Sequence, residues 1–275
     1  MTCAWDAMLS ILPARMRQEV DKLGRRSLRE LRLRQGAPPE LILPGGSVWL
    51  EGGCTRQEIG FCIQAASRYS PWASESVREG FLTAPGGHRI GLCGLSLYRD
   101  GVRTGLREIT SVCIRVARDF PGIAQTAPST GSVLILGAPG WGKTTLLRDL
   151  VRQRSRSVPV SVLDQRGELF PSGFDMGLRT DILRGCRKEE GLEQLLRTMG
   201  PSCIALDEIT AEDDCEALIR AAHCGVTLLA TAHAASMADF RSRPLYQRLG
   251  KSNIFDHILL LTEDKTFREE RMVCT

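Results

Sequence analysis

One short segment limits what this chain can fold into. Residues 137–144 read GAPGWGKT, the G-x-x-x-x-G-K-[ST] pattern of a phosphate-binding loop. An apolar run at 133–136 precedes this loop and is typical of a buried parallel strand. After the loop, Leu146, Leu147 and Leu150 recur at the spacing of one helical face. Strand, glycine loop and helix N-terminus together form an anion cradle, so the segment predicts a nucleoside triphosphate site.

Each position of the loop has an expected task. The Lys143 ammonium is expected to reach the β- and γ-phosphates, and the Thr144 hydroxyl to bind Mg²⁺. Trp141 is an unusual loop residue, which either stacks on the nucleotide or a neighbour or simply covers the loop. The predicted nucleotide-binding residues of the loop are Gly137, Ala138, Pro139, Gly140, Trp141, Gly142, Lys143, Thr144 and Thr145.

Composition fits an ordinary globular protein. The 275 residues are 43% hydrophobic and 25% charged, enough for one large or two modest domains. A net charge of +4 is too small to indicate nucleic acid without a basic patch. The best basic cluster consists of Arg25, Arg26, Arg29, Arg32 and Arg34, and a solvated face explains it more simply. We therefore expect no nucleic-acid partner.

Location is also constrained by the sequence. No run of eighteen apolar residues occurs, and the N-terminus lacks the pattern of a secretory signal, so we expect a cytoplasmic protein. The ten cysteines include no C-x-x-C pair, and His223 with Cys224 is too isolated for a zinc site. Reduced thiols are the simplest interpretation.

The chain divides into two expected parts. Residues 119–131 hold two prolines, two glycines and small polar residues, which predicts a linker, and we place the domain boundary so that residues 1–127 and 128–275 form separate domains. The first is expected to be a smaller α+β domain. Its predicted elements are a helix at 57–69 with Thr55 as its cap, and strands at 28–33, 40–43, 80–83, 88–93 and 111–117 in a small antiparallel sheet.

The second part alternates strand and helix patterns. Such alternation predicts an α/β domain with a mainly parallel sheet, whose ligands bind at the carboxyl ends of the strands. Besides the loop strand and its helix, the predicted strands are 159–164, 202–208, 226–231 and 257–261, and the predicted helices are 190–199 and 213–224.

Two carboxylates close the apolar strand at 203–208. Asp207 is expected to hold the Mg²⁺ shell, as an aspartate does at this place in phosphate-loop enzymes. The adjacent Glu208 can polarise an attacking water, which favours hydrolysis of ATP over a guanine-nucleotide switch. Glu168 follows the strand at 159–164 and competes with Glu208 for the role of general base. Alternatively, Glu168 pairs with Arg166 and has no part in the chemistry.

The following strand carries a candidate sensor. In the additional-strand class of RecA-like ATPases, this strand inserts between the acidic strand and the phosphate-loop strand. Its end at Thr231 and His233 would then point toward the γ-phosphate. Either side chain could distinguish triphosphate from diphosphate by a hydrogen bond, and His233 is the preferred candidate.

In their order, these motifs resemble the stage III sporulation protein AA family, which is related to the hexameric type II and type IV secretion ATPases. The resemblance covers most of the chain and includes segments 30–34, 80–91, 111–118, 137–150, 163–168, 178–183, 205–209 and 225–233. Three features depart from the family pattern: Trp141 replaces a small residue, Gln165 replaces an acidic one, and the tail after the last predicted strand is short.

Membership would imply a Mg²⁺-dependent ATPase that forms a homo-oligomer, expected to be a hexamer. It would work at the inner face of the mother-cell membrane with the integral-membrane proteins of a sporulation channel. In the related secretion ATPases, arginines of the N-terminal half reach the γ-phosphate. By resemblance, Arg89 or Arg115 would do so here, and surface arginines on strands are the simpler alternative.

Three other functions remain open at this stage. A nucleic-acid-dependent ATPase would use the arginine cluster at 25–34 as its contact. A small-molecule kinase would need an arginine-rich lid, for which Arg179, Arg184 and Arg187 are candidates, although the Asp207 and Glu208 pair argues against it. A scaffold that binds ATP without turnover is the third.

Overall fold

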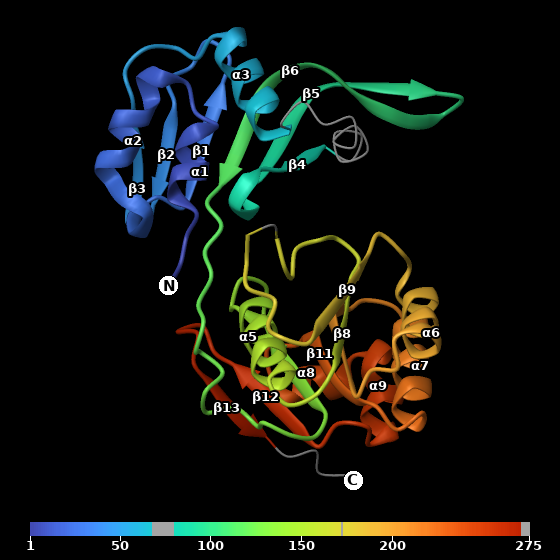
Figure 1. The fold of residues 1–275 in the computed structure, drawn as a ribbon. Coiled ribbons are helices and arrows are strands. Elements are labelled where there is room, and N and C mark those ends of the chain that lie inside the picture. Colours follow the sequence, from blue (N-terminus) through green and yellow to red (C-terminus); the bar gives the residue numbers. More distant parts are fainter. Residues whose placement is uncertain (68–79, 172, 271–275) are drawn as a thin grey trace. The chain divides into compact units, whose positions relative to one another are not determined.

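A computed structural model describes residues 1–67, 80–171 and 173–270 (Figure 1). The chain divides into two compact units, one of Met1–Asp119 with Pro171–Phe174 and one of Phe120–Phe170 with Asp175–Thr275. The first boundary thus falls at Asp119 and not near residue 127. The reason is local packing, because Ala124 and Ala127 are buried in a core of the second unit.

The first unit is an antiparallel sheet with helices. Its strands lie in the order β3-β2-β1-β6-β5-β4, and the antiparallel sheet predicted from the sequence is confirmed. The elements are α1 Trp5–Ser10, α2 Ala14–Ser27, β1 Glu30–Arg34, β2 Glu40–Leu43, β3 Gly46–Trp49, α3 Arg56–Ser67, β4 Phe81–Thr83, the 3₁₀ turn η1 Pro85–Gly87, β5 Arg89–Arg99 and β6 Val102–Arg115.

The predicted cap of α3 is present. Thr55 Oγ1 accepts from the Glu58 N–H at 3.1 Å, and the Glu58 carboxylate accepts from the Thr55 N–H at 2.8 Å, which is a capping box. Arg15 of α2 also binds this carboxylate and holds the pKa of Glu58 at about 2. Residues 68 and 69 of the expected helix lie outside the described residues. The helices α1 and α2 were not predicted.

The β5–β6 hairpin is much longer than predicted and projects beyond the other strands of its sheet (Figure 1). Its two-residue turn is Asp100–Gly101, and both residues have positive φ, as a type I′ turn requires. An Asp-Gly pair is a strong hairpin signal that the sequence reasoning missed. The outer residues of both strands are largely exposed, so no apolar alternation marks them.

The second unit is a mainly parallel sheet in the order β13-β12-β7-β11-β10-β8-β9, of which β13 alone pairs antiparallel among the described strands. Insertion of β11 between β7 and β10 confirms the additional-strand prediction. The elements are β7 Val133–Gly137, α5 Lys143–Ser155, β8 Val160–Asp164, β9 Thr180–Arg184, α6 Lys188–Thr198, β10 Cys203–Ile209, α7 Glu212–His223, β11 Thr227–His233, α8 Met237–Ser242, α9 Pro244–Ser252, β12 His257–Leu261 and β13 Phe267–Glu270.

Successive residues of the central strands face two different cores. On β7, Val133 and Ile135 pack with α5, whereas Leu134 and Leu136 pack with α6, α7 and α9. A parallel sheet covered on both faces reads as a continuous apolar run, which is why the central strands were recognisable. The edge strands β9 and β13 are half exposed and polar, and they were not predicted. Within the described part of the chain, no helix is long and apolar enough to cross a membrane.

Candidate nucleotide-binding site

The phosphate-binding loop joins β7 to α5. Gly140 and Gly142 have φ of 80° and 102°, a region that favours glycine. At Gly137 a Cβ atom would lie 3.1 Å from the Cβ of Leu261, so the loop begins where β12 leaves little room. The aromatic ring of Trp141 packs partly buried against the α5-side core. The motif therefore has the backbone form that an anion cradle needs.

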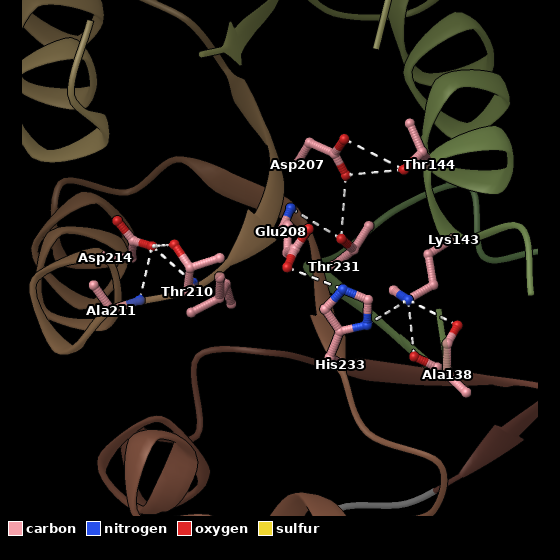
Figure 2. A network of polar contacts seen from close by, with 12 residues as sticks. Ala138, Lys143, Thr144, Asp207, Glu208, Thr210, Ala211, Asp214, Thr231 and His233 are labelled. Atoms are coloured by element: carbon pink, nitrogen blue, oxygen red, sulfur yellow. Dashed lines mark hydrogen bonds and ion pairs between the residues drawn. The ribbon is translucent and has the colours of Figure 1, made fainter. Parts of the chain in front are cut away.

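Lys143 is only 6% exposed and uses all three of its N–H donors. Its ammonium donates to the carbonyls of Gly137 at 2.8 Å and Ala138 at 3.0 Å, and it contacts His233 Nδ1 at 3.0 Å (Figure 2). Burial lowers the pKa of Lys143, while the charges of Glu208 and Asp207 oppose this shift.

These contacts assign the tautomer of His233. An ammonium has no acceptor, so Nδ1 must accept and Nε2 carries the proton of the neutral ring. His233 Nε2 lies 2.9 Å from Glu208 Oε1, to which it donates. One ring thus connects the loop lysine to the proposed base (Figure 2).

Asp207 is half-buried at the end of β10. Thr144 Oγ1 lies 3.3 Å from both carboxylate oxygens, and Thr231 Oγ1 donates to one of them at 3.2 Å. Burial raises the pKa of Asp207, and the charge of Asp164 adds to the rise. The paired hydroxyl and carboxylate oxygens of Thr144 and Asp207 suit Mg²⁺, which binds through one or two protein oxygens plus phosphates. No cluster of three His, Cys, Asp or Glu that could hold a metal occurs among the described residues.

A β-bulge explains how Glu208 reaches the same side as Asp207. On β10, Leu206 pairs with Ala230 but Ile209 pairs with Ala232, so β10 has one extra residue. Ile209 returns to the α6–α7 core. Glu208 is the extra residue and has φ of 44°, which is uncommon outside glycine. Neighbours on a regular strand face opposite sides, so this bulge is what brings both carboxylates together.

The end of β8 completes this region. Asp164 accepts the N–H groups of Glu168, Leu169 and Phe170, which folds the following loop back over the strand end. A cavity is lined from this loop, α5, β10 and α6 by Thr144, Asp164, Gln165, Arg166, Glu168, Lys188, Asp207, Glu208 and Thr210. Glu168 and Glu208 thus line the same cavity, and which of them is the base stays a prediction.

Several residues of this site were missed from the sequence. Tyr246 of α9 accepts the His233 N–H at 3.2 Å and donates to the Ile209 carbonyl at 3.3 Å. Lys188 and Asp214 form a buried pair behind β10. Lys188 precedes the predicted helix at 190–199, and Asp214 lies in the first turn of the predicted helix at 213–224. Charged residues at such positions are usually exposed, so only the tertiary structure reveals that these two form a buried pair.

Arg89 and Arg115 belong to the first unit. They are directly opposite each other in the β5–β6 pair. The guanidinium of Arg89 lies 4.4 Å from the centroid of the Phe81 ring, and Arg115 Nε lies 3.5 Å from a Glu30 oxygen. Their proposed contact with the γ-phosphate stays a prediction.

Solved structures give the class of fold. The ATPase DotB of Legionella pneumophila is 18% identical, with a TM-score of 0.59 over 94% of this chain and 79% of that chain. The pilus retraction motor PilT with bound ADP is 15% identical, with a TM-score of 0.62 over 89% of this chain and 76% of that chain. The chain thus has the phosphate-loop fold of these two proteins.

Sequence comparison gives the family. The sequence model of the protein family described as sporulation stage III, protein AA, matches residues 5–272 of this chain. Stage III sporulation protein AA of Bacillus subtilis strain 168 is 35% identical over 93% of this chain and 90% of its own length. Protein SEEDLING PLASTID DEVELOPMENT 1 of Arabidopsis thaliana is 26% identical over 90% of this chain, which spans 36% of that protein. This chain belongs to the stage III sporulation protein AA family.

Proposed function

We propose that this protein is a Mg²⁺-dependent ATPase that works as a secretion-type motor. The observation that carries the proposal is the bulge at Glu208, which brings Asp207 and Glu208 to the face where Lys143 and Thr144 lie. Family membership and the secretion-ATPase fold support it. The motor would be a homohexamer that acts with integral-membrane proteins of a sporulation channel, at the cytoplasmic face of the mother-cell membrane.

The loop geometry supports the proposed nucleotide binding. The ammonium of Lys143 would exchange the carbonyls of Gly137 and Ala138 for phosphate oxygens, which are better acceptors because they are charged. Thr144 and Asp207 would hold Mg²⁺. When bound, the metal neutralises charge on the β- and γ-phosphates. The raised pKa of Asp207 fits a carboxylate that gains its counter-charge only from the nucleotide complex.

Hydrolysis would depend on Glu208 and His233. The Glu208 carboxylate would accept a proton from the attacking water, with Glu168 as the alternative base in the same cavity. Without nucleotide, His233 Nδ1 accepts from Lys143. Once Lys143 turns to the phosphates, this acceptor is released, so His233 is positioned to respond to the γ-phosphate. We further propose, from the family resemblance, that Arg89 or Arg115 contacts the γ-phosphate.

Two variants test this assignment. Lys143→Ala should lose ATP binding, whereas Glu208→Gln should bind Mg²⁺–ATP and lose turnover by about 10²–10⁴-fold, the usual contribution of a general base. Fluorescent-nucleotide titration and phosphate release without any acceptor substrate measure the two steps. Normal hydrolysis by Glu208→Gln would move the base to Glu168. Absence of hydrolysis in the wild type under all conditions would favour a scaffold.

Oligomeric state is tested separately. Sedimentation of Glu208→Gln with and without Mg²⁺–ATP should show a shift to a mass of six subunits. A protein that stays monomeric with ATP bound would contradict the ring. Stimulation of turnover by DNA or RNA that falls steeply with salt would indicate a nucleic-acid-dependent ATPase instead.

A further inference from the structure

Lys188 is a buried lysine at an unfavourable place. It is the first residue of α6, where the helix dipole disfavours a cation, and it is only 8% exposed. Lysine is seldom buried unless its charge is paired. Specific contacts must therefore offset the cost of burying the Lys188 charge at this helix end.

Three acceptors surround its ammonium, one for each N–H. Lys188 Nζ donates to the backbone carbonyl of Glu208 at 2.5 Å, to Thr210 Oγ1 at 3.0 Å and to Asp214 Oδ2 at 2.9 Å. The same Asp214 oxygen accepts the N–H groups of Thr210 at 2.8 Å and Ala211 at 3.1 Å (Figure 2). The Asp214 carboxylate that binds Lys188 is thus itself held in place by two backbone N–H groups.

The contacted carbonyl belongs to the strained residue of the site. Glu208 has φ of 44°, a conformation that persists only where surrounding contacts determine it. Its N–H donates to Thr231 Oγ1 at 2.9 Å on one side of the bulge. On the other side its carbonyl accepts from Lys188. The residue is held at both polar ends of its backbone.

Simple ion pairing does not account for this arrangement. Asp214 already receives two backbone N–H groups and the Thr210 hydroxyl, and it could cap α7 without Lys188. The bond to the Glu208 carbonyl adds nothing to that cap. It holds the carbonyl of the same bulged residue whose carboxylate lies 2.9 Å from His233 Nε2.

We propose that Lys188 is a positioning residue, whose bond to the Glu208 carbonyl fixes the bulged backbone and so directs the Glu208 carboxylate into the hydrolytic site. The inference rests on the proposed role of Glu208 as a base. In the proposed mechanism, Lys188 itself contacts no phosphate. Its loss should therefore affect turnover and leave nucleotide binding nearly intact.

The test compares Lys188→Met with wild type. Methionine keeps an unbranched stem without the donors. Because a displacement of about 1 Å can cost about 10²-fold, kcat should fall by about that factor while the Kd for fluorescent ATP changes by less than about threefold. Lys188→Arg retains N–H donors and should keep a larger share of kcat. The exposed lysine of α9 supplies a matched control, Lys251→Met, with unchanged kcat.

Folding must be separated from positioning. Lys188→Met leaves the Asp214 charge buried and unpaired, which can destabilise the second unit. The double variant Lys188→Met with Asp214→Asn removes both charges and still lacks the donor to Glu208. It should melt closer to wild type than Lys188→Met and show the same fall in kcat. Recovery of wild-type kcat in this double variant would overturn the proposal.

A second double variant tests whether Lys188 acts through Glu208. In single-turnover assays, adding Lys188→Met to Glu208→Gln should slow hydrolysis little further, because both substitutions disable the same group, the Glu208 carboxylate. A further hundredfold fall would refute the proposal. If the wild type hydrolyses ATP and Lys188→Met does so equally fast, the inference fails while the ATPase assignment stands. If Glu208→Gln hydrolyses normally, the inference fails together with the assignment of Glu208 as the base, and the ATPase assignment still stands.

Discussion

Replacing Thr231 by valine removes one hydroxyl that bonds both the Asp207 carboxylate and the Glu208 backbone. Thr231 is fully buried on β11. Its Oγ1 accepts the Glu208 N–H at 2.9 Å and donates to Asp207 at 3.2 Å. Valine has nearly the same shape and neither function. The variant thus leaves the N–H of the strained Glu208 without its acceptor and takes one donor from the half-buried Asp207 carboxylate.

The size of the effect can be estimated from these two bonds. A buried polar group left without its partner costs about 1–3 kcal/mol. For a domain of roughly 150–250 residues, each kcal/mol lowers Tm by about 2–4 °C. A loss of about 2 kcal/mol therefore predicts that Thr231→Val melts about 4–8 °C below wild type. Freed at its N–H, the Glu208 bulge should also relax, so kcat should fall more than ATP affinity.

Thr231→Ser is the matched control, because it keeps the hydroxyl and loses one methyl group. That loss should cost about 1 kcal/mol, the value of one buried carbon with some cavity formation. Circular dichroism melting and phosphate release measure stability and turnover on the same samples. The reasoning is refuted if valine melts with wild type, or if serine lowers Tm and kcat more than valine does.

Three other predictions concern charged groups. Asp207→Asn should raise the Tm of the Mg²⁺-free protein at neutral pH and abolish hydrolysis. Because the pKa of Asp207 is raised in the folded state, its ionised form destabilises that state, and the stability of the wild type falls as the pH rises through the folded pKa. A lower Tm would contradict this. Arg15 lowers the pKa of Glu58 from 4.5 to about 2, so stability of the first unit should decline in acid between these values, and Glu58→Gln should lack that decline in acid melting curves. Asp149→Ala removes the acceptor of two linker N–H groups and should speed chymotryptic cleavage after Phe120; unchanged cleavage would show that other contacts hold the linker.

Much of the second unit was predictable because its signals are local. The phosphate loop is contiguous with its strand and helix, and the central strands are apolar on both faces. Errors occurred where this signal is weak. The edge strands β9 and β13 alternate little, and the outer β5–β6 hairpin is exposed on both faces. The linker boundary was placed too late because buried alanines cannot be distinguished from linker alanines in sequence.

The chemistry of the candidate site was predicted only by residue type. Sequence reasoning proposed Asp207, Glu208 and His233, but a regular strand would have turned the first two to opposite faces. One extra residue in β10, held at positive φ, alters that outcome. Its support comes from Thr231 and Lys188, which lie on other elements and carry no local signal of this task.

The sequence by itself determined the loop, the alternation of strand and helix and the family. These features depend on residue spacing within one segment or on the order of segments, and both can be identified from the amino-acid sequence alone. Only the tertiary structure decided which side chains meet. Register between strands, a single left-handed residue and the acceptors around a buried lysine determine that choice, because hydrogen bonding between distant elements depends on their positions in space.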